Sequence, residues 1–543
     1  MGGVGVAGSV SVAELLDGHV GLQVECLDRI YLNAYVPGLQ VGGQVVTFLT
    51  QHLGQPIPSP ALFARIGNRF RDQVARFATR QEIPLLRFGR HDRKIDKVRP
   101  LLHAAEQAGR PGVVAVGVAQ EFQNVFTASK RRSDPGRAVQ FTFRKEDRRV
   151  TCFYFYLWDE DFGPGFIKLC AWFPYPGKVW VNGHEWAKQQ ARKQGLGFTA
   201  LSNGFATCEQ PEQLQRICDR LGPADIQAFL ARWLELLPTP LDASDHAAGY
   251  WWELSMRQVE VSRTLVFDAP RRARGFFEAV VRDNLGLGRP EEVELTFTGR
   301  RVPRGRPRTR PETFRTRVVT TGVQVTVNVF YKHSRIKQYL KDGRALRIET
   351  VVNTPDDLGV GRRLVNLPQL QHKARAANRR ILAVQRAGQG CAIRTATFER
   401  LQQPYVREGQ RTGALRFGDH RAMALAGALC LTLAAVTGVT NRSLRALVAG
   451  LLGSTYSASQ MSYDLRRLRL HGLIRRIHRQ HRYVLTDDGQ RFAVFYTKLG
   501  DRVLPALFAA DQPNSPPQLR HALGVIGSCV DGYLTDAGLA AAA

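Results

Sequence analysis

The chain lacks the short motifs by which several classes of enzyme are recognised. It has no Gly-x-x-x-x-Gly-Lys-Ser/Thr phosphate loop, so nucleotide hydrolysis has no support. It has no Gly-x-Ser-x-Gly elbow, and its scattered cysteines offer no nucleophile with an obvious base. No His-x-His pair, a common metal signature of tyrosine nickases, occurs among its 13 histidines.

Cysteines and long apolar runs are also scarce. The 8 cysteines form no Cys-x-x-Cys pair, which argues against a zinc site or a disulfide framework and favours a reducing cytoplasm. The most apolar segment, residues 422–439, is interrupted by Gly427 and Gly438 and is expected to be a buried helix. The first twenty residues lack the basic start and apolar core of a signal peptide. We therefore expect a cytoplasmic protein without a membrane partner.

Acidic residues are few relative to basic ones. The chain has 76 Lys and Arg against 47 Asp and Glu, a formal net charge of +29. Because the hydrophobic fraction of 44% is ordinary for a globular protein, the positive charge is expected on folded surface and not only in a tail. Such a surface favours a polyanionic partner, DNA in the first place, with RNA as an alternative because its phosphates carry the same charge.

The last fifth of the chain has a helix, helix, hairpin pattern over residues 441–447, 457–470 and 472–485. In the second helix, Met461, Leu465 and Leu468 form the inner stripe. The polar residues outside this stripe and the arginines of the hairpin are candidates for contacts with base edges and phosphates. They are Gln460, Ser462, Tyr463, Arg466, Arg467 and Arg469 on the helix, and Arg475, Arg476, Arg479 and Arg482 on the hairpin.

The segment LRRLRLHGLIRRI, followed by HRYVLTDDGQRF, resembles the recognition helix and wing of MarR-like winged-helix proteins. The resemblance covers roughly residues 415–510 and implies a DNA-binding module. The alternative is a winged helix used only for packing or protein contacts.

The pattern along the whole chain predicts a multidomain α+β protein. We expect a flexible N-terminus (1–20), an α/β domain (21–145), an aromatic-rich α+β domain (146–300), an Arg/Pro-rich loop (300–311), an antiparallel sheet completing the central region (312–360), a basic helix and linker (361–412), a winged-helix domain (413–510) and a C-terminal tail (511–543). Trp172, Trp180 and Trp186 are expected to share one core. Asp28, Glu121, Asp159 and Asp161 form no spacing pattern and are expected on the surface.

Two further basic segments are candidate phosphate contacts. The first contributes Lys130, Arg131 and Arg132. The second is interleaved with prolines, which prevent a regular helix, and contributes Arg300, Arg301, Arg304, Arg306, Arg308 and Arg310. The alternative for both is a solvated surface loop.

Residues 331–350 place many ionisable groups on predicted strands. The pattern K…IKQYLKDG…LRIET resembles the tyrosine/lysine strand and the Leu-Arg-Ile-Glu strand of rolling-circle replication initiators. The resemblance implies a tyrosine that attacks a DNA phosphodiester with the help of a divalent ion. Tyr339 or Tyr331 would be the nucleophile, Lys332, Lys337 and Arg347 the phosphate clamp, and Glu349 and Glu260 the ligands of Mg or Mn. The alternative is that Arg347 and Glu349 form ion pairs across strands.

The whole chain is also similar to long, basic bacterial proteins that combine an Asn-Gly-His/Arg-Glu-Trp segment, a Leu-Arg-Ile/Val-Glu-Thr strand and a terminal winged helix. The corresponding segments here are residues 182–186, 346–350 and 465–483. This similarity implies no activity. We expect a DNA-binding protein of a mobile element or plasmid-like replicon, with nicking as the catalytic possibility. The alternative is a non-catalytic regulator or the protein component of a ribonucleoprotein.

Overall fold

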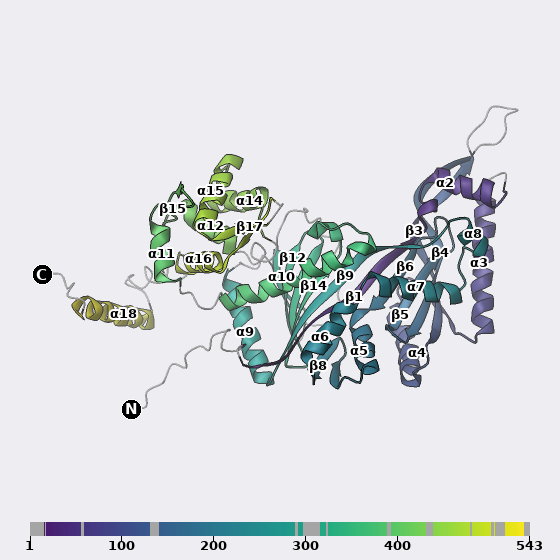
Figure 1. The fold of residues 1–543 in the computed structure, drawn as a ribbon, viewed down its shortest axis with the longest axis horizontal. Helices are drawn as coiled ribbons and strands as arrows, with labels where there is room; N and C mark the ends of the chain where they lie inside the picture. Colours follow the sequence, from purple (N-terminus) through teal and green to yellow (C-terminus); the bar gives the residue numbers. More distant parts are fainter. Residues whose placement is uncertain are drawn as a thin grey trace.

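The computed structural model describes residues 16, 18–55, 59–130, 141–287, 292–296, 315–321, 324–387, 393–430, 438–477, 481–500, 504 and 516–536. These residues form a multidomain α+β protein, with one large mixed sheet and a C-terminal helical module beside it (Figure 1). The predicted fold class is therefore confirmed. None of the helices among the described residues is long and apolar enough to cross a bilayer.

The sheet has twelve strands, with β1 (Val20–Tyr35) and β9 (Glu253–Phe267) paired antiparallel at its centre. Beyond β1 follow β6 (Gly177–Asn182), β5 (Gly163–Cys170), β4 (Phe141–Asp159), β3 (Gly112–Lys130) and β2 (Leu85–Phe88). Beyond β9 follow β14 (Ala345–Val352), β13 (Ser334–Lys341), β12 (Gln324–Tyr331), β11 (Arg315–Thr321) and β10 (Glu292–Thr296). Only the outermost pair on each side is parallel.

The two halves of the sheet repeat the same order of elements. Each begins with a central strand, continues through a helix to an edge strand, and returns to the centre through four antiparallel strands. The crossover helices are α3 (Pro60–Arg80) and α9 (Pro270–Leu287). The predicted boundary at residue 145 lies inside β4, and that at 300 separates the paired strands β10 and β11. The sheet is thus continuous across both boundaries.

Alternate residues of β4 enter two different cores, because successive side chains of a strand point to opposite faces. Phe153, Phe155 and Leu157 join the main core, which includes residues of α3, α5 (Gly183–Lys193), α6 (Pro211–Arg220), α7 (Pro223–Leu236) and α10 (Leu367–Ala387). Tyr154 and Tyr156 face the other way, toward the core that contains Val98 of α4 (Lys94–Ala108).

The expectation of one core for three tryptophans is wrong. Trp186 is buried in the main core, whereas Trp172 packs edge-on against Phe63 in another cluster. Trp180 stacks on Phe166, on the tyrosine side of the sheet. A Gly/Pro turn and an alternating pattern predict a hairpin, but they do not say which face is covered by helices.

The remaining elements of the sheet domain are short. They are η1 (Pro37–Leu39), α2 (Gly42–Thr47), η2 (Phe48–His52), β7 (Phe198–Leu201), β8 (Gly204–Cys208), α8 (Ala243–Ala247), η3 (Pro355–Leu358) and η4 (Leu364–Asn366). The tip of the β7–β8 hairpin approaches β14, where Asn203 contacts Arg347. This hairpin covers part of the second half of the sheet.

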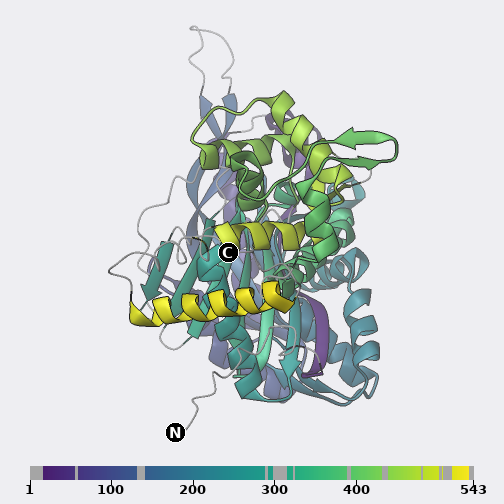
Figure 2. The same cartoon turned by 90° about the vertical axis from the view of Figure 1, so that its left-hand side faces the viewer.

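The C-terminal module contains the predicted helix, helix, hairpin arrangement. Its elements are α11 (Thr395–Gln402), β15 (Tyr405–Arg407), β16 (Gln410–Thr412), α12 (His420–Cys430), α14 (Asn441–Leu452), α15 (Ala458–Leu470), β17 (Ile474–Arg476), β18 (Tyr483–Leu485) and α16 (Asp487–Lys498), with α18 (Pro517–Asp536) after it. Val439 forms a single β-bridge with Tyr483 of β18, beside the two-stranded β17–β18 pair. Figure 2 shows the β15–β16 hairpin projecting from the module.

Side-chain caps explain where α14 and α15 begin. Thr440 accepts a hydrogen bond from the backbone N–H of Ser443 and so caps α14. Ser457 accepts one from the N–H of Gln460, whose side chain accepts one from the N–H of Ser457 in return. These reciprocal bonds satisfy backbone donors that have no partner within the helix.

Candidate functional site

The two sides of α15 differ sharply in exposure. Met461, Leu465 and Leu468 are buried in the module core, as the predicted inner stripe requires. The opposite side leaves Gln460, Ser462, Tyr463, Arg466 and Arg469 exposed. The helix therefore has one fully packed side and one polar, basic side that no described element covers.

Arg467 does not belong to this exposed side, contrary to the prediction. It is only 8% exposed, and its Nε donates to the carbonyl of Gly413 at 3.3 Å. Its Nη1 also reaches Oδ1 of Asp464 at 3.5 Å, and Asp464 is fully buried. Residue 467 lies three positions after residue 464 and so shares the inner side of the helix. Arg467 therefore holds the module together and is unsuited to contact a partner.

Two of the exposed polar residues are partly engaged in local bonds. The side chain of Gln460 belongs to the helix cap, and Oγ of Ser462 accepts a hydrogen bond from Nδ2 of Asn441 at 2.9 Å. Among the described residues, Arg466 makes only a long contact to Oε1 of Gln410 at 3.4 Å, on the β15–β16 hairpin. Tyr463 is 47% exposed. The side chains freest to reach outward are thus Tyr463, Arg466 and Arg469.

The β15–β16 hairpin adds a basic element where the sequence pattern predicted a linker. Arg407 and Arg411 are exposed on it, and its last residues lie against α15. The ring of His471 also bonds to the carbonyl of Gly413 at 2.9 Å, which anchors the hairpin to the end of α15. The segment from Arg407 to Arg411, with a Glu-Gly turn between two arginines, was the available signal for a basic hairpin.

The predicted wing arginines lie partly toward the sheet domain. Arg475 and Arg476 are exposed, and Arg482 is half-buried. Burial, together with the positive charges of Arg475 and Arg482, lowers the pKa of Arg380 on α10. The wing is therefore close to this helix and is not simply an extension of the α15 surface.

Several predicted phosphate contacts lie outside the described residues. These are Arg131, Arg132, Arg300, Arg301, Arg304, Arg306, Arg308, Arg310 and Arg479. Lys130 is the last residue of β3. Their contribution to binding stays a prediction.

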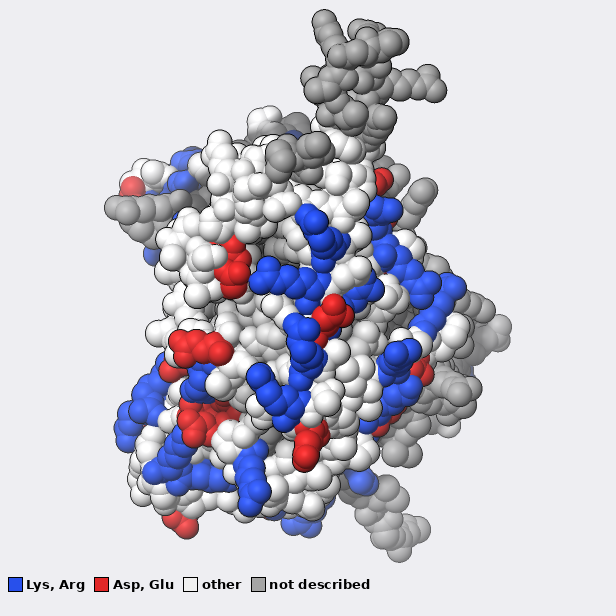
Figure 3. Space-filling model, turned by 90° about the vertical axis from the view of Figure 1, so that its right-hand side faces the viewer, with Lys and Arg blue, Asp and Glu red and all other residues white. Residues whose placement is uncertain are grey.

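Basic charge on the sheet domain is mostly interspersed with acidic charge. Figure 3 shows lysines, arginines and carboxylates side by side on the face at the α3 and α4 end. Lys97 pairs with Asp92 at 2.6 Å, and Arg99 with Asp96 at 3.4 Å. On α10, Arg375 pairs with Asp219 and Arg379 with Glu25. These arginines fasten α10 to α6 and β1, so α10 is a packed helix of the sheet domain.

Arg347, a predicted phosphate clamp, lies at the centre of a buried ionic network. It is 1% exposed and contacts Asp28 through Nη2, Oε1 of Glu349 at 3.0 Å and Oγ1 of Thr264 at 3.0 Å. Its Nη1 also donates to the carbonyl of Asn203. Nζ of Lys337, directly across from Glu349 on β13, is 3.6 Å from Oε2 of that residue. The geometry therefore matches the alternative of ion pairing: Arg347 pairs with Asp28 and Glu349, and Glu349 also lies beside Lys337.

Tyr339 also belongs to this network, since its hydroxyl donates to Oε1 of Glu349 at 2.6 Å. Burial and the negative charge of Glu349 raise its pKa, so the hydroxyl stays protonated at neutral pH. Burial of Glu349 opposes ionisation, but Arg347 and Lys337 outweigh it and lower the pKa. Glu349 is ionised and already neutralised by cations, an arrangement that does not fit an added Mg or Mn ion. Glu260, the second predicted metal ligand, faces Arg29 at 3.9 Å.

Tyr331 and Lys332 lie apart from Tyr339. Tyr331 packs against the cluster that includes α9 residues, on the sheet face opposite to Tyr339. Lys332 occupies the turn between β12 and β13, where its Nζ is 5.2 Å from the centre of the Tyr331 ring. Tyr339 lies five residues beyond Ser334, the first residue of β13, and so is roughly 16 Å along the strand from the turn that holds Lys332. The structure therefore brings together Tyr339, Lys337, Arg347 and Glu349 but not the whole predicted set. Among the described residues, no group of three or more His, Cys, Asp or Glu side chains could hold a metal.

Asp28 and Asp159 are buried, contrary to the expectation that they lie on the surface. Burial raises the pKa of Asp28 to about 7, although Arg347 opposes the shift. Glu121 is half-buried, which by itself would raise its pKa. Its bonds to Lys168 and Lys94 outweigh this effect and lower the pKa to about 2. The partners of these carboxylates come from distant segments, which spacing along the chain does not reveal.

The raised pKa of Asp28 makes one contribution to stability depend on pH. The folded chain holds this proton more tightly than the unfolded chain, so folding loses stability as the pH rises from about 4 to about 7. Asp28→Asn removes the titration and is expected to become more stable relative to the native chain over this range. Urea unfolding at about pH 4.5 and pH 7.5 measures the difference. Parallel pH profiles for the two chains would contradict it.

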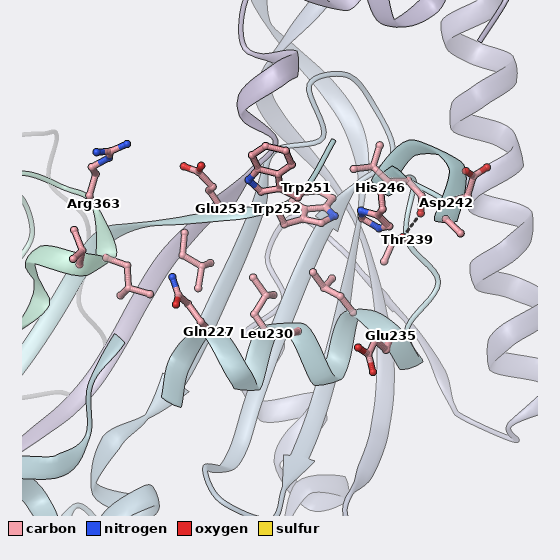
Figure 4. Close-up of a pocket in the computed structure, with 17 residues that line it drawn as sticks. Gln227, Leu230, Glu235, Thr239, Asp242, His246, Trp251, Trp252, Glu253 and Arg363 are labelled. Atoms are coloured by element: carbon pink, nitrogen blue, oxygen red, sulfur yellow. Dashed lines mark hydrogen bonds between the residues drawn. The ribbon is translucent and has the colours of Figure 1, made fainter. Parts of the chain in front are cut away.

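A cavity of about 790 Å³ lies between α7, the start of β9 and η4. Figure 4 shows Trp251, Trp252 and Leu230 around it, with Glu235, Glu253 and Arg363 at its margin. Nε1 of Trp252 is buried and has no hydrogen-bond partner among the described residues. Two of the polar residues serve the fold: Asp242 caps α8, and Glu253 accepts a bond from the hydroxyl of Tyr35 at 2.9 Å. No motif or spacing in the sequence indicated this cavity.

No family model, curated protein or solved structure matches the chain. The similarities to MarR-like proteins, to rolling-circle initiators and to long basic bacterial proteins therefore stay predictions. Two structural features bear on function instead: the exposed residues of α15 with the β15–β16 hairpin, and the buried state of the Arg347 network.

Proposed function

We propose that this protein binds duplex DNA through the exposed side of α15 and the adjacent β15–β16 hairpin. The observation that carries the proposal is the asymmetry of α15, whose inner side is packed while Tyr463, Arg466 and Arg469 are exposed. An α-helix with its side chains is about 10–12 Å wide and fits a major groove about 12 Å wide. Arginine and tyrosine can contact phosphates there, and arginine also reads guanine edges.

The charge of the chain supports the same proposal. A net charge of +29 favours a polyanion whichever sugar it contains, so RNA is an outcome that the test must separate from DNA. The helical geometry of α15 favours duplex DNA, because the major groove of duplex RNA is too narrow for side chains to read. A mobile element or plasmid-like replicon stays the predicted biological setting.

Cleavage of DNA at Tyr339 is a prediction that the contacts do not favour. The hydroxyl donates to Glu349, and the basic groups beside it are occupied by carboxylates. A tyrosine nucleophile needs a nearby base or metal and an accessible phosphate. Nicking of supercoiled DNA by the native chain with magnesium or manganese, but not by Tyr339→Phe, would establish this activity.

Salt-dependent binding tests the proposal. The full chain is expected to bind a labelled duplex, with a logarithm of affinity that falls linearly with the logarithm of salt concentration. Each neutralised phosphate contributes a slope of about −0.9, so five of them give a slope near −4.5. Fluorescence anisotropy across a salt series measures it, with duplex RNA of the same sequence as the comparison. A slope near zero, or equal affinity for both duplexes, would contradict the proposal.

A further inference from the structure

A row of aromatic side chains crosses neighbouring strands on the tyrosine side of the sheet. Tyr31 of β1 lies opposite Trp180 of β6, Trp180 opposite Phe166 of β5, and Phe166 opposite Tyr156 of β4. The rings of Phe166 and Trp180 are 6.1 Å apart and almost parallel, and that of Tyr31 is 6.0 Å from Phe166. We call these four residues the aromatic row.

The aromatic row emerges from the core toward solvent. Tyr156 is buried, 5% exposed, beside residues of the α4 core. Phe166, Trp180 and Tyr31 are half-buried, and Arg257 at the next strand is exposed. An ordinary core would cover all of these rings, so the open end presents ring surface to a partner.

Cations flank the open end of the aromatic row. The guanidinium of Arg257 is 5.4 Å and Nζ of Lys178 is 5.8 Å from the centre of the Tyr31 ring. Lys178 bonds to Oδ1 of Asn33 at 2.5 Å, and neither cation forms a salt bridge with a carboxylate among the described residues. Burial, with the like charges of Arg257 and Lys168, lowers the pKa of Lys178 to about 8. An anion at this position would relieve the repulsion between the cations.

Rings beside cations that form no salt bridge among the described residues suit a ligand that carries flat bases and phosphates together. In duplex DNA the bases are stacked inside and cannot reach a sheet surface, whereas unpaired bases can stack on protein rings. We infer that the aromatic row, with Arg257 and Lys178, binds single-stranded nucleic acid. This inference extends the proposed function from the terminal module to the sheet, and it assumes the same class of partner. The protein would then hold duplex and single strand at separate places.

Binding of oligothymidylate and oligouridylate, each about 20 nucleotides long, to the full chain tests the inference. Trp180→Ala and Arg257→Ala are each expected to weaken binding by about 5-fold to 100-fold, as loss of a stacked base or its cation does elsewhere. Trp180→Phe keeps a ring and is expected to stay within about 3-fold of the native affinity. Tighter binding of either polymer supports the inference and shows which of the two single strands the site prefers.

The matched control is Arg71→Ala, which removes one exposed positive charge from α3, over the opposite face of the sheet. It is expected to change single-strand affinity by less than about 2-fold. Arg257 is exposed, so its replacement is not expected to disturb folding. Arg257→Ala therefore tests the inference even if Trp180→Ala fails to fold. Native-like affinity in Arg257→Ala, or no binding of single strands by the native chain, would overturn the inference. If Trp180→Ala and Arg257→Ala weaken single-strand binding but keep duplex binding, the aromatic row is a site separate from α15. A native chain that binds single strands but no duplex would contradict only the proposed function.

Discussion

Replacing Arg347 with methionine is expected to lower the free energy of unfolding by about 3–5 kcal/mol. The change removes the shared cation of Asp28 and Glu349, which are buried with exposed fractions of 2% and 4%. Without the guanidinium, Glu349 keeps only Lys337 as a charge partner, and Asp28 is pushed further toward its protonated form. Tryptophan fluorescence during urea unfolding reports this effect on the sheet domain, because all 7 tryptophans precede residue 253.

Two comparisons separate loss of charge balance from loss of packing. Arg347→Met combined with Asp28→Asn and Glu349→Gln removes the unpaired charges and is expected to recover most of the lost stability. Arg362→Ala breaks an ion pair with Asp356 on the surface, where both side chains are more than half exposed, and is expected to cost less than about 1 kcal/mol. If Arg347→Met and Arg362→Ala lowered the free energy of unfolding equally, the buried network would depend on its arginine no more than the surface ion pair does.

Removing Arg466 and Arg469 together is expected to weaken duplex DNA binding by about 2–6 kcal/mol, or roughly 30-fold and more. Both arginines are exposed on the outer side of α15, and neither contributes to the module core. Alanine is a good helix former, so the double variant keeps the helix. The slope of affinity against salt is expected to become shallower by about 0.9 for each phosphate that these arginines neutralise in the native complex. Anisotropy titrations with one duplex at several salt concentrations give both quantities.

The control for this variant carries the same change of charge elsewhere. Arg71→Ala with Arg80→Ala removes two exposed arginines from α3 and is expected to leave duplex affinity within about 3-fold of the native value. A loss of affinity in the control equal to that in the α15 variant would mean that net charge, and not the surface of α15, governs binding. The proposed interface would then be wrong.

Local features of the C-terminal module could be predicted from the sequence, because they depend on contacts between residues close in the chain. The inner stripe of α15 and the hairpin after it follow from helical and strand periodicity. Arg467 was misplaced because a charged residue on the inner side was not expected. Its partners, Asp464 three residues away and Gly413 directly after the β15–β16 hairpin, make that position acceptable.

The sheet could be predicted only as separate strands. Periodicity identifies a strand, but it does not identify its neighbour when the partner is far away in the chain. Asp28 and Arg347 are separated by 319 residues, so neither spacing nor composition could reveal their contact. The same limit explains the aromatic row, because Trp180 meets Tyr31 only after β1 and β6 have paired. For Tyr339 and Glu349 the sequence leaves catalysis and ion pairing open, because periodicity does not show how close Arg347 and Lys337 lie to the carboxylate.

The central pairing of β1 with β9 has a consequence for biosynthesis. During synthesis all residues of β1 and β6 are made before any residue of β9, so β1 can pair with β6 while its other neighbour is still missing. One long edge of β1 then has unpaired backbone groups, which can recruit strands from other nascent chains. Truncation before residue 253 would leave this edge permanently open, and we expect such fragments to aggregate more readily than the full chain.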